Sequence, residues 1–435
     1  MSTFRMRLAL PERVSPSIAA SSFYWTPTGN DSFAATLGPG VQLGPRLGAM
    51  GPIPQKNAEF VHLAAAVFAA DRSVPRAGGG SEWNSRRIQV VVPVRDVAAW
   101  NAIADEMAEL VGFLTGDTWT IKFYRAASRR EKVEPHPTPV ARVLLLSGGA
   151  DSAVGALVSR SRLQLDETHA LLSHVGLTTL SPVQRRVASS AERLLPGPCQ
   201  RHVQVRFGRH AKRVDGGHYA DEPSSRSRSL LFLSLGLAEA SIDAAPLWIA
   251  ENGFASLNPP LGPERRGSLS TRTTHPAFLR GLSELLVRVG AHADIENPFA
   301  SLTKGEMFAL AAQLVGSDEA SDYLSATHSC GLSGQRAFGL PTNSQCGVCF
   351  GCTVRRAAFH AAGLKDQTDY IASRGDVRIE SWLRRNSVVR PMRDFVRRGV
   401  KSRDVVTMSL PPDYAASDAL DLCSRAVVEL KGFLG

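Results

Sequence analysis

The stretch VLLLSGGADSAVGALVSR, residues 143–160, decides the fold. It passes from four apolar residues into Ser147-Gly148-Gly149-Ala150-Asp151-Ser152 and then into a helical pattern. Glycines let the backbone approach an anion closely, and the amides at the start of a helix point towards it. The two serines can add hydroxyl donors, and Asp151 can position a magnesium ion or orient a nucleotide. An ordinary Gly-Gly turn is the alternative, but the complete motif favours a phosphate-binding loop, and the lack of a following Gly-Lys-Ser/Thr excludes a Walker A loop.

From residue 141 onward, apolar runs alternate with helical patterns. They predict strands at 141–147, 168–176, 199–207 and 246–253, and helices at 151–162, 181–195 and 226–244. Such alternation indicates βαβ units and a doubly wound parallel sheet. Ligands of these sheets bind beyond the carboxyl ends of the strands, which is where the loop lies.

The rest of the chain adds material on both sides of this α/β core. We expect an N-terminal α+β domain at 1–125, a linker at 126–139, the core at 140–365 and a C-terminal helical extension at 366–435. The linker is charged, contains prolines and has few apolar residues. The N-terminal domain should contain helices at 57–72 and 96–114 and strands at 87–94 and 116–124, with Asp96 and Gly116 capping the second helix.

Composition limits the class of protein. Of the 435 residues, 43% are hydrophobic and 21% are charged, which is typical of a globular protein. No window approaches the ~18–20 continuous apolar residues of a membrane span, and the first residues lack the apolar core of a signal peptide, so we expect a cytoplasmic protein. The formal net charge of +10 makes nucleic-acid binding possible, but the basic residues are scattered along the chain as short pairs and single residues, which does not favour it.

Four of the six cysteines form a cluster: Cys330, Cys346, Cys349 and Cys352. Two Cys-x2-Cys steps and one distant cysteine can supply the four thiolates of a tetrahedral zinc ion. An iron–sulfur cluster is the alternative, but the cysteine followed by proline that such clusters use is missing. Four thiolates close the coordination sphere, so a structural role is favoured over a catalytic one.

The Ser-Gly-Gly-x-Asp-Ser loop resembles the PP-loop of the N-type ATP pyrophosphatases, whose core is HUP-like. Together with the late cysteine cluster, it resembles the QueC branch of that family, which makes 7-cyano-7-deazaguanine from 7-carboxy-7-deazaguanine and ammonia. The resemblance implies that ATP is cleaved between its α and β phosphates. A substrate carboxylate attacks the α phosphate, the loop holds the departing pyrophosphate with Mg²⁺, and an amine then displaces AMP.

Further segments resemble the family in order: SRSLLFLSLGLAEA, ENGF, NPFASLTKGEMFALA, THSCG and CTVRRAAFHAAG. The resemblance implies that Arg228 and Lys304 are cations near the phosphates, although without it a surface salt bridge would be as good an interpretation of either. The catalytic candidates are Ser147, Asp151, Ser152, Arg228 and Lys304. The candidates for nucleotide contact are Leu146, Ser147, Gly148, Gly149, Ala150, Asp151, Ser152, His174 and Asn252. His174 follows the second core strand, where a lone histidine is more often a scaffold residue.

The sequence also departs from the family. The substrate loop of QueC proteins has a Tyr-Pro-Asp-Cys-Arg-Pro-Glu-Phe stretch, and here RTTHPAF, residues 272–278, keeps only the proline and the phenylalanine. The long flanking segments resemble the long QueC-like proteins of anti-phage operons, such as QatC of the Qat system. That resemblance implies a deazaguanine-type substrate, with an amine on a partner protein as acceptor. The alternatives are nitrile synthesis, tRNA modification by the same loop, and a non-catalytic scaffold.

Overall fold

The computed structural model describes most of the chain: residues 3–9, 21–26, 31–38, 40–76, 85–126, 132–135, 138–176, 178–259, 272–332, 338–340 and 344–435. Residues 127–131 and 136–137 of the predicted linker lie outside this set. In the part of the chain that is described, every helix is too short or too polar to cross a bilayer.

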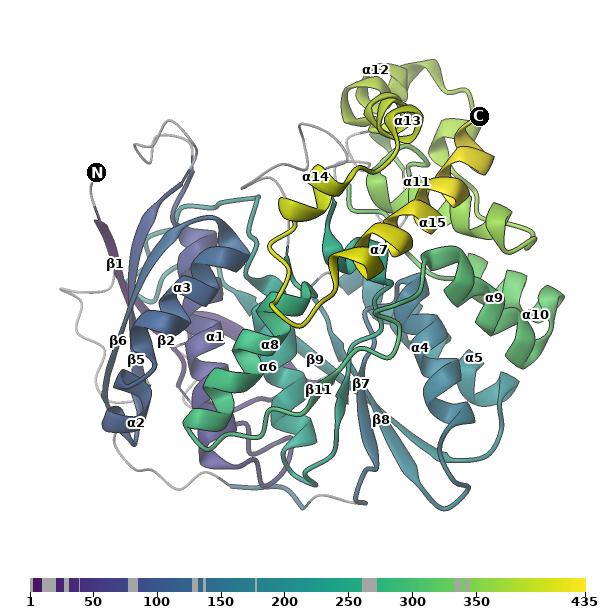
Figure 1. Cartoon of the computed structure of the whole chain (residues 1–435). Coiled ribbons are helices and arrows are strands. Elements are labelled where there is room, and N and C mark those ends of the chain that lie inside the picture. The colour runs from purple at the N-terminus through teal and green to yellow at the C-terminus, as the bar shows by residue number, and fades with distance from the viewer. Residues whose placement is uncertain are drawn as a thin grey trace.

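A seven-stranded sheet forms the centre of the molecule (Figure 1). Its order is β11-β10-β7-β8-β9-β3-β4, and the strands from β11 to β9 run parallel. The bounds are β11 (Ile295–Glu296), β10 (Leu247–Trp248), β7 (Arg142–Leu145), β8 (Thr168–His174), β9 (Cys199–Arg209), β3 (Phe33–Leu37) and β4 (Val41–Gln42). The predicted parallel α/β core is therefore confirmed, with β10 much shorter than the predicted strand.

Helices cover both faces of this sheet because successive strand residues point to opposite sides. Val143 and Leu145 of β7 pack into one apolar core, and Leu144 and Leu146 pack into another. The first core lies against α6 (Arg228–Ala240) and α8 (Pro276–Arg288), and the second against α4 (Ala150–Ser161), α5 (Ser181–Leu194) and α9 (Lys304–Val315). A near-continuous apolar strand is what a sheet covered on both faces requires.

The N-terminal residues form a second, four-stranded parallel sheet of order β2-β1-β5-β6. Its strands are β1 (Thr3–Ala9), β2 (Ser22–Tyr24), β5 (Arg87–Val94) and β6 (Thr118–Arg125), and its helices are α1 (Gln55–Ser73), α2 (Val97–Asn101) and α3 (Ala104–Thr115). Helix α1 is buried almost throughout, since it contacts this sheet on one side and α6 on the other. The two sheets therefore share one apolar core.

Strand β3 comes from the N-terminal part of the sequence but pairs antiparallel with β9 of the central sheet. Residues 33–42 thus belong structurally to the core, although the N-terminal domain was predicted to include them. The boundary at residue 125 stays a prediction.

The C-terminal residues form helices, the last of which packs beside α9 and α11 (Phe350–Ala361). They are α12 (Val377–Asn386), α13 (Val389–Arg398), α14 (Ser402–Val406) and α15 (Ala416–Leu434), and Figure 1 draws the last of them in yellow. The described residues also form α7 (Gly253–Leu257), α10 (Ser317–Ser325) and the short 3-10 turns Thr178–Leu180 and Ile371–Ser373.

The prediction of one continuous helix at 96–114 is wrong, because the structure has two helices there, α2 and α3. The N–H of Ile103 bonds to the carbonyl of Trp100, three residues back instead of four, which interrupts the α-helical hydrogen-bond pattern. Both predicted caps are confirmed. The Asp96 side chain accepts a hydrogen bond from the N–H of Ala99, and Gly116 ends α3 in the left-handed conformation.

Candidate active site

The loop begins at Leu146, whose backbone is fixed by the neighbouring strand. Its N–H donates to the carbonyl of Leu172 (2.7 Å), and its carbonyl accepts from the Ser173 hydroxyl (2.7 Å). The side chain is fully buried. The structure therefore gives Leu146 the role of anchoring the loop to β8, with both backbone groups already bonded.

Ser147, Gly149 and Ser152 form a compact hydrogen-bonded turn. The Ser147 Oγ lies 3.0 Å from the Ser152 Oγ and accepts from the N–H of Gly149 (3.2 Å). Gly149 is the N-cap of α4, and no described side chain caps the first amides of that helix. Uncapped amides at a helix N-terminus attract an anion through their N–H groups and the helix dipole. The loop thus has the geometry of a phosphate site.

Gly148 has a backbone φ of +87°, which L side chains rarely adopt, and a Cβ there would meet the Gln184 Cγ at 3.2 Å. We expect Gly148→Ala to lower the free energy of unfolding by about 1–2 kcal/mol. Urea unfolding would measure it, with Gly208→Ala as the matched control, because Gly208 lies in β9 with open space around it. Equal stability of the two variants would contradict the loop conformation.

Asp151 lies at the centre of the site and joins three elements. Its carboxylate accepts from the Asn252 side-chain amide (2.7 Å), which follows β10, and forms an ion pair with Lys304 (2.5 Å), the first residue of α9. Both side chains of the ion pair are largely buried, with 8% and 11% exposure. Asn252 also caps α7, since its Oδ1 accepts from the N–H of Ala255. Asn252 and Lys304 therefore hold Asp151 in place directly.

Burial raises the pKa of Asp151, but the Lys304 ammonium group and the hydrogen bonds with Glu251 and Asn252 outweigh burial, so this pKa lies below the ordinary aspartate value. The carboxylate is therefore ionised at neutral pH. Glu251, which sequence reasoning missed, stands next to it: the Asn252 Nδ2 is 3.3 Å from the Glu251 Oε1 and 2.7 Å from the Asp151 Oδ2. The sequence signal that could have identified Glu251 is an acidic residue shortly after β10, the strand adjacent to β7.

Arg228 begins α6 and lies near the end of β8. A Cβ added to Gly176 would lie 3.5 Å from its Nη1 atom. Arg228 as a whole residue is exposed, and no carboxylate in the described part of the chain pairs with its guanidinium group. Surrounding protein atoms lower its pKa from the ordinary arginine value. This is an available positive charge beside the carboxyl ends of the parallel strands.

His174 lies beside Arg228 but is bonded to the scaffold. Its Nε2 donates to the carbonyl of Phe207 (2.8 Å), and its ring packs against Phe232. Burial lowers the pKa of His174 to about 4, so the ring is neutral at pH 7. Gln184, a second residue that sequence reasoning missed, donates to the carbonyls of both Ser147 and His174 (3.3 Å each) and so connects the ends of β7 and β8.

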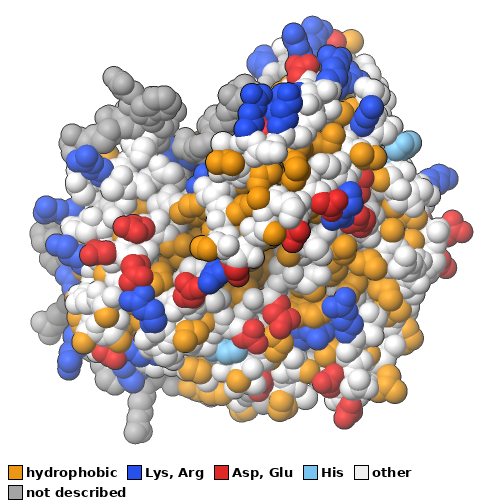
Figure 2. All heavy atoms as spheres, viewed as in Figure 1, with side chains coloured by type: hydrophobic (Ala, Val, Ile, Leu, Met, Phe, Trp, Pro, Cys, Tyr) orange, Lys and Arg blue, Asp and Glu red, His pale blue; other side chains and the backbone are white. Residues whose placement is uncertain are grey.

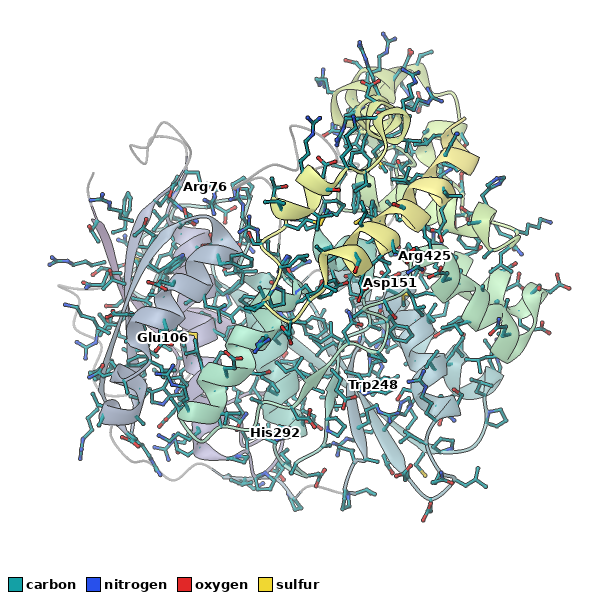
Figure 3. All side chains as sticks on the ribbon, viewed as in Figure 1. Arg76, Glu106, Asp151, Trp248, His292 and Arg425 are labelled. Carbon is teal, nitrogen blue, oxygen red and sulfur yellow. The ribbon has the colours of Figure 1, made fainter. Side chains whose placement is uncertain are left out.

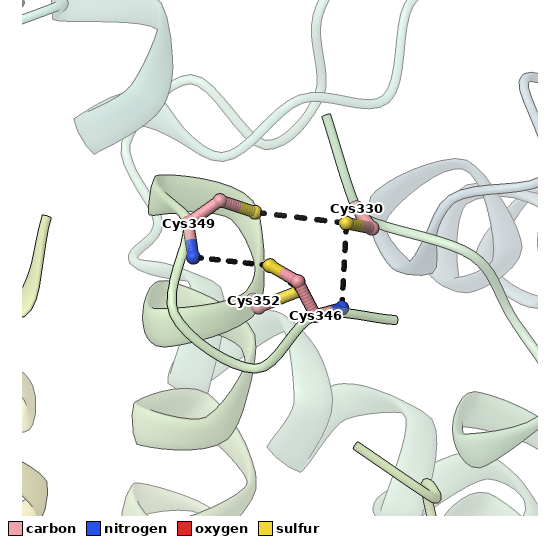
Figure 4. A group of neighbouring side chains, drawn as sticks. All are labelled: Cys330, Cys346, Cys349 and Cys352. Atoms are coloured by element: carbon pink, nitrogen blue, oxygen red, sulfur yellow. Dashed lines mark hydrogen bonds between the residues drawn. The ribbon is translucent and has the colours of Figure 1, made fainter. Parts of the chain in front are cut away.

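The four predicted metal ligands come together as a group. The Sγ atoms of Cys330, Cys346, Cys349 and Cys352 all lie within 4.8 Å of one another (Figure 4). Two of the Sγ–Sγ separations are 3.8 and 3.9 Å, and four sulfurs at about 2.3 Å from one zinc ion would be about 3.8 Å apart. The N–H groups of Val348 and Cys349 donate to the Cys346 Sγ (3.4 and 3.3 Å). The donor set fits zinc.

The cysteine cluster is connected to the phosphate loop through the backbone. The N–H of His328, two residues before Cys330, donates to the carbonyl of Gly148 (2.9 Å). Arg355 also holds this segment in place, because its buried guanidinium group donates to Leu324 and Thr327. Because one chain segment carries both the His328 contact and a cysteine of the cluster, a metal held there would stabilise the loop as well.

Thr274 and Pro276 of the 272–278 stretch line part of a cavity of about 160 Å³. Its other walls are α7 and the segment after β11, and the lining residues are Gly253, Ser256, Leu257, Thr274, Pro276, Leu279, Asn297 and Ala300. Within this stretch His275 is structural, because its Nδ1 accepts from Ala277 and its Nε2 donates to Met408. The Ser256 and Thr274 hydroxyls are hydrogen-bonded to each other (3.2 Å). The cavity begins one residue from Asn252 and therefore adjoins the Asp151 group.

Positive charge is less evenly distributed than the paired arginines of the sequence indicated. Residues 374–403 contain ten Lys and Arg against three Asp and Glu, which is most of the net charge of +10. Figure 2 shows Lys and Arg side chains gathered on the helices α12 to α14 at the top of the view. The C-terminal extension thus has a strongly basic surface.

Curated proteins similar to this chain share its core. 7-Cyano-7-deazaguanine synthase of Cupriavidus taiwanensis is 30% identical over 251 residues, which cover 53% of this chain and 97% of that protein. The chain belongs to the 7-cyano-7-deazaguanine synthase (QueC) family. The synthases of Cupriavidus necator and Novosphingobium aromaticivorans are each 29% identical, covering 53% and 54% of this chain and 97% of each protein. No family model and no solved structure matches the chain.

The QueC relatives are matched over nearly their full length, whereas almost half of this chain has no counterpart in the alignment. The resemblance to QueC proteins is therefore confirmed. Resemblance to the long anti-phage forms remains a prediction. The shared part cannot contain both the N-terminal and the C-terminal regions described above, because the aligned residues are too few.

Proposed function

We propose that this QueC-family chain activates the carboxylate of a 7-deazaguanine with ATP and passes it to an amine. The observation that carries the proposal is the uncapped N-terminus of α4 after the Gly148–Gly149 turn, with the cation Lys304 at the start of α9 and the cation Arg228 at the start of α6. A phosphate chain needs backbone N–H donors and nearby positive charge.

In the proposed reaction, a carboxylate oxygen attacks the α phosphorus and the bond to the β-phosphate oxygen breaks. The loop amides and the hydroxyls of Ser147 and Ser152 bind the departing pyrophosphate, and Arg228 balances its charge. Asp151 and Glu251 are the carboxylates that would bind Mg²⁺, which would supply further positive charge. The amine then attacks the acyl carbon, loses a proton and releases AMP.

The cavity of about 160 Å³ is the proposed substrate site, because it adjoins Asn252 and is lined by Thr274 and Pro276 of the 272–278 stretch. Its walls have apolar side chains and the hydroxyls of Ser256 and Thr274, which suit a flat heterocycle with a few hydrogen-bonding groups. Since the family's charged substrate stretch is replaced here, we propose that these hydroxyls read the base.

We further propose that the acceptor is an amine of a partner protein, in an anti-phage function. The support is the long part of the chain that has no counterpart in the QueC relatives, since it offers additional surfaces on which a partner could dock. Nitrile synthesis is the alternative, favoured by the names of the relatives. A nitrile requires a second activation of the amide, so it consumes two ATP per product instead of one.

A nucleic acid is a second candidate acceptor, favoured by the basic surface at residues 374–403. Association through phosphates weakens steeply with salt, with log K falling about 0.7–0.9 per phosphate contact for each unit of log salt. If tRNA is the acceptor, product formation should fall steeply as the salt concentration rises. Replacing Arg384 and Arg385 should make this decrease less steep. A protein acceptor would depend on salt much less.

The experiment incubates the protein with ATP, Mg²⁺, 7-carboxy-7-deazaguanine and either ammonia, tRNA or the products of neighbouring genes. AMP and the mass of each acceptor are then measured. The proposal predicts AMP with every productive acceptor and loss of AMP in a folded Ser147→Ala variant. If no acceptor, including tRNA, yields AMP, the chain is a scaffold and the proposal fails.

A further inference from the structure

Two carboxylates outside the catalytic core hold the helices that carry the two site cations. The first is Glu429 of α15. Its Oε1 accepts from the Thr303 hydroxyl, and its Oε2 accepts from the N–H of Gly305 (3.1 Å). These residues flank Lys304 in the sequence. A Cβ on Gly305 would lie 2.5 Å from the Glu429 Oε1, so glycine is needed for this close approach.

Arg425, one turn before Glu429, strengthens the same contact. Its guanidinium group pairs with Glu306, which completes the capping box of α9 with Thr303, and it also donates to the carbonyl of Ser301 (3.0 Å). Asp151 and Arg425, both labelled in Figure 3, therefore contact the same first turn of α9, one through Lys304 and the other through Glu306. Helix α15 thus fixes the start of α9 from outside.

The second carboxylate is Asp71 of α1, which performs the same role at α6. Its Oδ2 accepts from the N–H groups of Arg226 (2.7 Å) and Ser227 (2.9 Å) and from the Ser227 hydroxyl (2.8 Å). Ser227 is the N-cap of α6, and Arg228 is its first residue. Asp71 is completely buried, and Arg86 pairs with it, which keeps it ionised. The pKa of Asp71 is lowered despite its burial, chiefly by Arg86.

We propose that Asp71 and Glu429 are positioning residues that set Arg228 and Lys304 against the nucleotide, so that both flanking regions complete the active site. The inference rests on the proposed function. The inference goes beyond the proposed function, because Asp71 and Glu429 lie too far apart in the sequence for one alignment of 251 residues to include both. At least one of them therefore lies outside the part shared with the QueC relatives.

The test combines each carboxylate with each cation. Glu429→Gln and Asp71→Asn are each made in the wild type, in Lys304→Met and in Arg228→Met, with Glu109→Gln and Asp166→Asn as exposed controls. Turnover to AMP and the Kd for ATP are measured for all. We expect about a 10- to 100-fold loss of kcat/KM from either carboxylate variant and no change from the controls, since displacement of about 1 Å costs up to 10²-fold.

The effect of each carboxylate variant in the wild type, in Lys304→Met and in Arg228→Met distinguishes positioning from a general loss of stability. Glu429→Gln should have little further effect in Lys304→Met but its full effect in Arg228→Met, and Asp71→Asn should show the reverse. A general loss of stability would instead be equal in every background and would overturn the proposal. Gly305→Ala, which crowds Glu429, and Ser227→Ala, which removes one donor to Asp71, repeat the test if a carboxylate variant does not fold.

The two proposals fail separately. A wild type that binds ATP but forms no AMP contradicts the proposed function, while the Kd for ATP still shows whether the carboxylates act through their cations. A wild type that forms AMP, with Kd and kcat unaffected by Glu429→Gln and Asp71→Asn, contradicts this inference alone.

Discussion

Asp151→Asn is expected to lower kcat/KM for AMP formation by at least about 100-fold while the protein stays folded. The asparagine keeps the shape but removes the charge that Lys304 and Asn252 hold beside the loop. Loss of one preorganised electrostatic group in an active site typically costs 10²–10³-fold. Steady-state AMP release would measure it. Asp166→Asn, an exposed change at the surface, serves as the control, and activity within threefold of the wild type would contradict a role for Asp151.

The same ion pair predicts how stability depends on pH. Because the folded pKa of Asp151 lies below its unfolded value of about 3.9, the pair stabilises the fold above that pH. The contribution is lost as the pH falls through the lower, folded pKa. Lys304→Met should therefore reduce the free energy of unfolding at neutral pH by about 3 kcal/mol, since it leaves a buried carboxylate unpaired. The difference from wild type should shrink below about pH 4 in urea unfolding, and a constant difference would contradict the assignment.

Removal of the metal is expected to have the second largest effect. Cys349→Ser should lower metal content from about one zinc per chain to near zero, and the melting temperature should fall sharply because binding to a structural site contributes directly to folding. AMP formation should fall with it, because the segment of Cys330 carries the His328 contact to Gly148. Elemental analysis and calorimetry would measure both.

Cys423→Ser is the matched control, since Cys423 is buried in α15 and stands outside the cluster. It should leave the metal content unchanged even if packing suffers slightly. A Cys349→Ser protein that keeps full stability and its metal would show that the cysteine group does not bind zinc.

Patterns among residues close together in the sequence were enough to predict the parallel sheet, the loop at 147–152 and the cysteine group. The alternation from residue 141 onward gave the parallel sheet, and the motif at 147–152 identified the loop between β7 and α4. The cysteine spacing predicted the group that the structure brings within 4.8 Å. In each case the determinants lie close together in sequence or repeat with the period of one element.

The remaining features depend on contacts between distant residues. Strand β3 has no pattern that reveals its pairing with β9, because this partner lies about 170 residues away in the sequence. Glu251 and Gln184 contact the loop only after the strands align. The roles of Asp71 and Glu429 likewise depend on docking of α1 and α15, which no local motif encodes.

The central claim is that a substrate carboxylate attacks the α phosphorus of ATP at the 147–152 loop. The most direct measurement uses 7-carboxy-7-deazaguanine labelled with ¹⁸O in its carboxylate and determines the mass of the AMP produced. The account predicts that one ¹⁸O from the carboxylate appears in AMP, because the oxygen that attacked the phosphorus leaves with it. Unlabelled AMP, or ADP and phosphate as products, would contradict it.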